Sequence, residues 1–148
     1  MIQLTKIFQF EMAHAIHGYP GACKNIHGHS YELHVTVSAV NSNKNYIPAP
    51  GFVMDFKEIK RLVYNSIIAG LDHKVILSSK FLLDNPAYTS QENLVEWEAE
   101  PTAENMLIFI KQKLTTQLPA EVKLVQLKLY ETKDSYAEWI NVNTFNQY

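Results

Sequence analysis

The sequence predicts an α+β fold in which an antiparallel sheet carries helices on one of its faces. Three observations lead to this prediction. Residues 2–13 and 27–40 alternate apolar and polar side chains, as half-buried strands do. Two later stretches repeat apolar residues at helical spacing, and two more strand-like stretches close the chain. This order favours one domain over residues 1–148, with a four-stranded antiparallel sheet and two helices between strands 2 and 3.

The first two strands both bring histidines onto an apolar face. In the first strand His14 continues the apolar parity of Phe8, Phe10 and Met12. A loop over residues 15–26, which contains two glycines and a proline, leads to the second strand. There His27 and His29 share their parity with Tyr31, Leu33, Val35 and Val37. Two further histidines are interpreted as ordinary polar residues, His17 in the loop and His34 on the opposite parity.

The middle of the chain predicts the two helices. The first is expected to begin after Asp55, a favourable N-cap, and to stop at Gly70. The second is expected to be capped by Thr102 and to end before Pro119, with an apolar stripe of Met106, Ile110 and Leu114. Residues 77–100 predict only a turn at Asn85-Pro86 and otherwise a surface excursion. Residues 122–132 and about 136–144 are the closing strands.

Composition narrows the class of protein. With 13 Lys and Arg against 15 Asp and Glu and no basic block, the chain is not expected to bind nucleic acid. No apolar run approaches the length needed to span a bilayer, and residues 1–10 lack the features of a signal peptide. The single Cys23 has no partner for an internal disulfide. A cytoplasmic location is therefore expected.

Three of the histidines are candidate metal ligands. Residues two apart on a strand project to the same side, so His27 and His29 can reach one point, and His14 can supply a third nitrogen across an antiparallel pair. Three neutral imidazoles leave one tetrahedral position open, as in catalytic zinc sites, although such ligands also bind other divalent metals. The alternative is a set of partly buried polar residues that hold no metal.

Three further features carry possible chemistry. Cys23 lies four residues before His27, in a loop near the expected metal, and a nearby metal can lower the pKa of a thiol and make it reactive. The alternatives are that Cys23 is a small buried residue or a fourth zinc ligand. Asp72 next to His73 can form half of a proton relay, in which the carboxylate orients the imidazole. The alternative is an ordinary surface turn. Glu131 continues an apolar parity, so its carboxylate needs a multiply donating partner, unless the strand has ended and Glu131 is solvated.

Six fragments, in this order, resemble the 6-pyruvoyl-tetrahydropterin synthase family over nearly the whole chain: FEMAH at 10–14, CKNIHGH at 23–29, GFVMDF at 51–56, LDH at 71–73, PTAEN at 101–105 and LYET at 129–132. The resemblance implies the tunnelling fold, in which three subunits build a twelve-stranded barrel and two trimers form a hexamer. It implies zinc (Zn2+) on His14, His27 and His29, and active sites at subunit interfaces. It also implies roles for five other residues: Cys23 as general acid or base, Asp72 and His73 of a neighbouring subunit as its relay, Glu131 as the pterin anchor and Thr102 at the polar edge of the ring.

The spacing between Cys23 and His27 resembles that of the bacterial 6-carboxy-5,6,7,8-tetrahydropterin synthases of the queuosine pathway. The implied reaction converts 7,8-dihydroneopterin triphosphate to 6-carboxytetrahydropterin, with release of acetaldehyde and triphosphate. One alternative is a 6-pyruvoyl-tetrahydropterin synthase, which releases triphosphate only. A second alternative is a zinc-stabilised, pterin-binding oligomer without turnover. Ala103 stands where some members carry a second hydroxyl residue.

Overall fold

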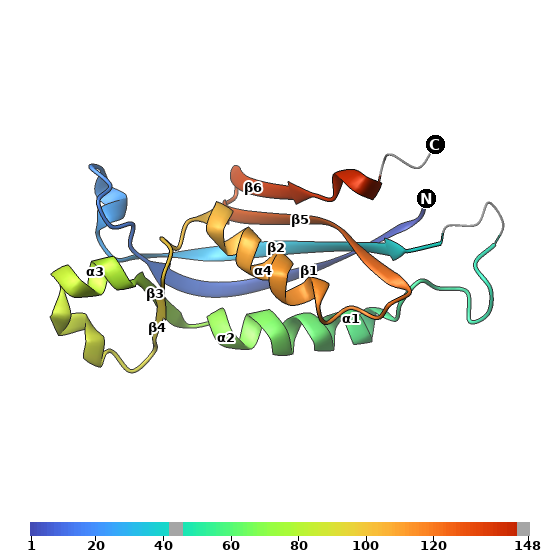
Figure 1. Cartoon of the computed structure of the whole chain (residues 1–148), viewed down its shortest axis with the longest axis horizontal. Helices are drawn as coiled ribbons and strands as arrows, with labels where there is room; N and C mark the ends of the chain where they lie inside the picture. Colours follow the sequence, from blue (N-terminus) through green and yellow to red (C-terminus); the bar gives the residue numbers. More distant parts are fainter. Residues whose placement is uncertain (42–45, 145–148) are drawn as a thin grey trace.

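The computed structural model describes residues 1–41 and 46–144, and its single sheet is mixed and has six strands (Figure 1). The spatial order is β4-β3-β1-β2-β5-β6. Antiparallel pairing joins β1 to β2, β2 to β5 and β5 to β6, as predicted, whereas β3 and β4 add parallel pairs beside β1. The strands are β1 Gln3–His14, β2 His27–Ala39, β3 Lys74–Ser78, β4 Leu94–Trp97, β5 Val122–Thr132 and β6 Ser135–Ile140.

The four-stranded prediction is wrong, because β3 and β4 extend the sheet beyond β1. β3 contains Ile76 and Leu77, which are both fully buried, and a short run buried on both faces shows no alternation that would reveal a strand. The segment that follows is also more than a surface excursion, since it contains α3 Ser79–Asp84 and a short 3-10 helix, Pro86–Ser90. As a result the last residues of β1 lie between two strands, with His14 opposite His27 on β2 and opposite Ile76 on β3.

The first long helix begins where the sequence predicts and ends later. α1 Phe56–Val63 starts after Asp55, whose carboxylate accepts a hydrogen bond of 2.8 Å from the backbone N–H of Lys57. It continues through a π-helical turn, Tyr64–Ile68, into α2 Ala69–Leu71, and Figure 1 shows α1 and α2 in one line beside the strands. The predicted stop at Gly70 is therefore wrong. Asp72 is the C-cap, and the residue with left-handed backbone is His73, at φ 60°.

The second long helix follows the prediction closely. α4 Ala103–Thr115 is capped by Thr102, whose hydroxyl accepts a hydrogen bond of 3.2 Å from the backbone N–H of Asn105. The helix ends before Pro119, and its predicted apolar stripe is buried. α4 packs over β5 and β6, while α1 and α2 contact β1, so one core forms between these helices and the sheet.

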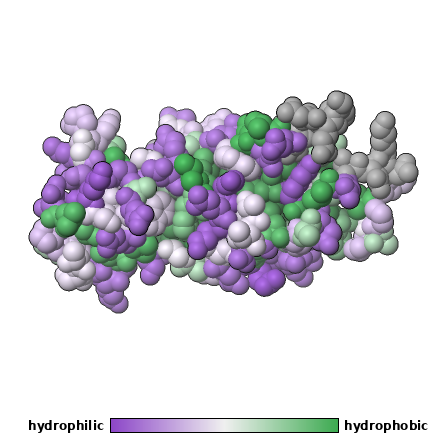
Figure 2. Space-filling model, in the orientation of Figure 1, coloured by the Kyte–Doolittle hydropathy of each residue, from purple (hydrophilic) through white to green (hydrophobic). Residues whose placement is uncertain are grey.

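Apolar and polar side chains divide the sheet into two faces. The inward residues of β1, β2 and β5 join the helices in the core, whereas the opposite face carries polar side chains such as Gln9 and Glu32. Figure 2 shows hydrophilic side chains spread over the visible surface, with small apolar areas between them. In the part of the chain that the structure describes, none of the helices is long and apolar enough to cross a membrane. The three histidines that the sequence selects lie on the core side, at one end of the sheet.

Candidate metal centre

The histidine cluster forms where β1 ends and β2 begins. His14 and His27 are direct partners across the antiparallel pair, and His29 follows two residues further along the same face of β2. The Nε2 atoms of His14 and His27 are 3.2 Å apart. His14 is buried, because β3 covers one side of its strand and the segment before α4 covers its ring. The alternation of apolar residues thus carries three imidazoles to one end of the core.

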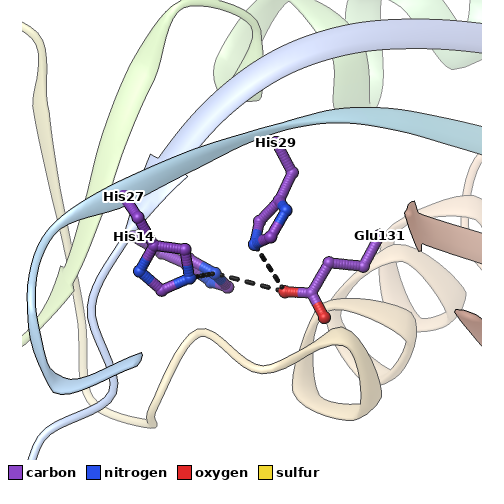
Figure 3. A group of neighbouring side chains, drawn as sticks. All are labelled: His14, His27, His29 and Glu131. Carbon is purple, nitrogen blue, oxygen red and sulfur yellow. Dashed lines mark hydrogen bonds and ion pairs between the residues drawn. The ribbon is translucent and has the colours of Figure 1, made fainter. Parts of the chain in front are cut away.

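Glu131, near the end of β5, reaches the same cluster (Figure 3). Its Oε1 lies 3.2 Å from the Nε2 of His14 and 3.2 Å from the Nε2 of His29. One ligand atom from each of these four residues falls within 4.8 Å of all the others. The sequence interpretation placed Glu131 on the inner face but did not place it beside the imidazoles.

Two backbone carbonyls determine where the imidazole protons are. Nδ1 of His14 is 2.7 Å from the carbonyl oxygen of Pro101, and Nδ1 of His27 is 2.8 Å from that of Asn25. A carbonyl oxygen only accepts, so each Nδ1 carries the proton and donates it. In the neutral rings both Nε2 atoms then present lone pairs, and these face each other. A cation bound between the two nitrogens would remove this repulsion. A metal-bound histidine usually donates the N–H of its other ring nitrogen to a carbonyl or carboxylate, which orients the ring, as Pro101 and Asn25 do here.

His29 adds an unpaired nitrogen to the cluster. Its Nε2 is buried and makes no hydrogen bond to any residue that the structure describes, although it lies 3.2 Å from Oε1 of Glu131. Burial lowers the pKa of His29, and the Glu131 carboxylate opposes part of that shift. An imidazole that stays neutral and has a free lone pair in a buried position is suited to bind a metal.

The carboxylate of Glu131 is ionised in this setting. The pKa of Glu131 lies below its ordinary value; the largest cause is its contact with the ring of His14, and partial burial opposes the shift. Tyr31 completes the surroundings from β2, with its hydroxyl donating to Oε1 of Glu131 over 3.4 Å. Burial raises the pKa of Tyr31 above its ordinary value, so the phenol remains a donor.

The four residues fit a divalent metal. Imidazole nitrogens and carboxylate oxygens bind zinc at about 2.0–2.2 Å, which puts neighbouring ligand atoms of a tetrahedral site about 3.3–3.6 Å apart. The contacts of 3.2 Å between His14 and His27, and between Glu131 and two of the histidines, are close to that spacing. The donor set would suit zinc as well as other divalent transition metals.

Cys23 lies outside this cluster. It belongs to the 3-10 turn Ala22–Lys24, where its side chain is exposed and its carbonyl oxygen accepts a hydrogen bond of 2.8 Å from the backbone N–H of Ile16. The turn leads directly through Asn25, which orients His27, into β2. The thiol is therefore accessible on a loop that is tied to the metal ligands, which suits a reactive group better than a small buried residue.

Asp72 and His73 form a contact pair at the edge of the sheet. Nδ1 of His73 lies 3.0 Å from Oδ1 of Asp72, and this same oxygen accepts a hydrogen bond of 2.9 Å from the backbone N–H of Glu11 on β1. The ring of His73 is 78% exposed and lines a hollow of about 460 Å³ with Glu11 and Asn93. The pair is thus preformed but points outward, and it is not part of the cluster around His14.

The segment before α4 supplies contacts that sequence reasoning missed. Pro101 orients His14 through its carbonyl, and the carboxylate of Glu100 accepts a hydrogen bond of 2.8 Å from the backbone N–H of His17. Carbonyl contacts leave no side-chain signature, so only the fragment around Pro101 hinted at them. Thr102 follows at once, half-buried, and caps α4. Two histidines stand apart as expected, with His17 beside Asp84 and His34 beside Glu32.

Comparison with known proteins agrees with these features. Residues 3–141 match the family model described as 6-pyruvoyl tetrahydropterin synthase. A 6-carboxy-5,6,7,8-tetrahydropterin synthase of Rickettsia typhi is 33% identical over 143 residues, which cover 93% of this chain and 99% of that protein. A 6-pyruvoyl tetrahydrobiopterin synthase of Pongo abelii is 32% identical over 117 residues, covering 78% and 68%. The solved 6-pyruvoyl tetrahydropterin synthase of Caenorhabditis elegans has a TM-score of 0.65 at 19% identity, with 95% of each chain covered, and shows the shared fold.

Proposed function

Since the chain belongs to the 6-pyruvoyl tetrahydropterin synthase family, we propose that it is a zinc-dependent lyase acting on 7,8-dihydroneopterin triphosphate. With one water consumed, the products are 6-carboxytetrahydropterin, acetaldehyde and triphosphate. The observation that carries the proposal is the convergence of three imidazole nitrogens, of which two are fixed as lone-pair donors by backbone carbonyls. The choice of product is supported by the Rickettsia relative and by the spacing between Cys23 and His27.

His14, His27 and His29 are the proposed metal ligands. When bound there, zinc supplies Lewis-acid polarisation of the oxygens on the substrate side chain, which acidifies the neighbouring protons. The rings keep their orientation during turnover because Pro101 and Asn25 hold two of them. Exclusion of water is helped by the burial of His14.

Glu131 and Thr102 are the proposed pterin-binding residues. A carboxylate can accept two parallel N–H bonds from the guanidine-like N2/N3 edge of a pterin, and this edge-on pairing orients the ring. The hydroxyl of Thr102 accepts from the backbone N–H of Asn105, which leaves its own proton free to be donated to the ring.

Proton transfer is assigned to Cys23, Asp72 and His73. The Cys23 thiolate takes up and returns a proton at the substrate side chain, and Asp72 orients His73 to handle a second proton. His73 is exposed and lies apart from the histidine cluster, so it serves the site of a neighbouring subunit. This division requires an oligomer, and we propose a hexamer of two trimers. Support comes from two open sheet edges in the described part of the chain, since β1 pairs with β3 only over Met12–His14 and β6 has one partner.

The products test the proposal against both alternatives. Purified, zinc-loaded protein is incubated with 7,8-dihydroneopterin triphosphate, and the mixture is analysed by mass spectrometry together with an enzymatic assay for acetaldehyde. We expect 6-carboxytetrahydropterin and acetaldehyde in equal amounts. Triphosphate with 6-pyruvoyl-tetrahydropterin and no acetaldehyde would favour the reaction named for the Pongo relative. Bound but unchanged substrate would favour the non-catalytic oligomer.

A further inference from the structure

Glu131 occupies the place of a fourth metal ligand rather than that of a free anchor. Its Oε1 is equidistant from His14 and His29, at 3.2 Å from each Nε2, and these distances are close to those of neighbouring ligands in a tetrahedral site. Figure 3 shows this oxygen directed at the imidazoles and the second carboxylate oxygen directed away from them. With a metal bound to the three histidines, a side chain of the same subunit would therefore fill the fourth position.

This position conflicts with recognition of a pterin by the same carboxylate. Bidentate pairing with the N2/N3 edge needs both oxygens of Glu131 on one side of the ligand. Oε1 is held between two imidazoles and also accepts from the hydroxyl of Tyr31, so it is not free to take part. One carboxylate cannot satisfy both partners at once, and the side chain must move between them.

We propose that Glu131 is an exchangeable ligand that closes the metal site at rest and leaves it when a guanidine-like edge binds. This inference rests on the proposed function, because it takes the pterin edge as the competing partner. Only compounds that offer two parallel donors to the carboxylate would open the fourth position. Recognition of the ring would then be coupled to access of substrate oxygens to the metal, and water would be kept from the metal until the ring is seated.

The surroundings of Glu131 allow this movement. The side chain is 32% exposed, so a part of it already faces solvent, and it lies near the end of β5, where the pairing with β6 shifts register between Tyr130 and Thr132. The three imidazoles, by contrast, are fixed on paired strands, and two of them by carbonyl contacts. The carboxylate is thus the least constrained of the four side chains and has room to move. The contact with Tyr31, at 3.4 Å, is long and costs little to break.

Cobalt-substituted protein reports on the ligands directly, because the visible spectrum of Co2+ depends on ligand number and geometry. We would load wild-type, Glu131→Gln and Glu32→Gln proteins with Co2+ and measure spectra and Co2+ affinity. The probe is 6-methylpterin, which keeps the N2/N3 edge but has no side-chain oxygens. Glu32→Gln is the matched control, since Glu32 lies on the opposite face, beside His34. Because Gln has the same size and shape as Glu, the variants are expected to fold. The titration of wild-type protein with 6-methylpterin tests the proposal without any variant.

Without pterin, Glu131→Gln should change the Co2+ spectrum and weaken Co2+ binding on the order of tenfold or more, while Glu32→Gln should match the wild type. Saturation of wild-type protein with 6-methylpterin should shift its spectrum toward that of Glu131→Gln. It should also weaken Co2+ binding by the factor by which Co2+ weakens pterin binding. Identical spectra and affinities of wild type and Glu131→Gln would overturn the proposal, as would a wild-type spectrum unaffected by bound 6-methylpterin. If either of these results were obtained while the wild type still formed acetaldehyde, the ligand exchange would be refuted but the proposed function would remain supported.

Discussion

Replacement of His73 by glycine should affect stability and catalysis in opposite directions, so that the two roles of this residue can be measured separately. Among the described residues His73 is the one non-glycine residue with positive φ, at 60°, and its ring is largely exposed. Its backbone N–H donates a hydrogen bond of 2.6 Å to the carbonyl oxygen of Glu11, which fixes the strained conformation. Strain of this kind at a proposed catalytic residue is typical of sites where function decides the residue type.

The magnitude follows from two opposing effects. A left-handed backbone costs a residue with Cβ about 1–2 kcal/mol, whereas glycine loses about 0.5–1 kcal/mol more conformational freedom on folding. The exposed contact of His73 with Asp72 adds little. His73→Gly should therefore leave stability unchanged or raise it by about 1 kcal/mol, which is a Tm increase of up to about 4 °C for a chain of this size. Turnover should fall on the order of a hundredfold or more through loss of the proton relay.

His73→Ala is the matched control, because it removes the imidazole but keeps the strain. Thermal unfolding of the metal-loaded proteins by circular dichroism and turnover at saturating substrate would be measured side by side. We expect both variants to lose turnover equally and His73→Gly to unfold at the higher temperature. A glycine variant that is less stable than the alanine variant would contradict the strain argument. A glycine variant with wild-type turnover would remove His73 from the proposed relay.

Three further predictions test the ligands, the thiol and the assembly. Elemental analysis should show that His27→Ala loses most of its zinc. His34→Ala is the control and should keep about one zinc per chain, because His34 lies beside Glu32 on the opposite face. Full zinc retention in both variants would refute the site. Cys23→Ala should keep its zinc and lose turnover on the order of a hundredfold or more, because the thiol lies outside the ligand cluster. Loss of zinc in that variant would make Cys23 a ligand, and unchanged turnover would make it an ordinary loop thiol. Light scattering should show a hexamer, and a monomer at all concentrations would exclude a site shared between subunits.

Much of the fold follows from residue periodicity. The alternation in the first two strands predicts their inner face and places His14, His27 and His29 on it, and the structure pairs His14 directly with His27. The caps at Asp55 and Thr102 are confirmed for the same local reason, since each side chain satisfies a helix N–H that has no other partner.

The remaining features depend on contacts distant in sequence. β3 shows no alternation in its sequence, because its last three residues are all buried. The first helix runs past Gly70, because Gly70 keeps helical geometry and His73 turns the chain. The approach of Glu131 to the imidazoles depends on the pairing of β2 with β5, about 100 residues apart. The orienting carbonyls of Pro101 and Asn25 are main-chain atoms, which every residue has, so residue type did not identify them.

Metal removal and restoration test the central claim most directly. Wild-type protein would be stripped with a chelator, assayed for acetaldehyde from 7,8-dihydroneopterin triphosphate, and assayed again after addition of one equivalent of zinc per chain. We expect acetaldehyde formation to fall in proportion to the zinc removed and to return with it, because a metal would bind the facing nitrogens of His14 and His27 and the buried nitrogen of His29, which makes no hydrogen bond to any described residue. Undiminished acetaldehyde formation by the fully stripped protein would contradict a metal-dependent reaction at this cluster.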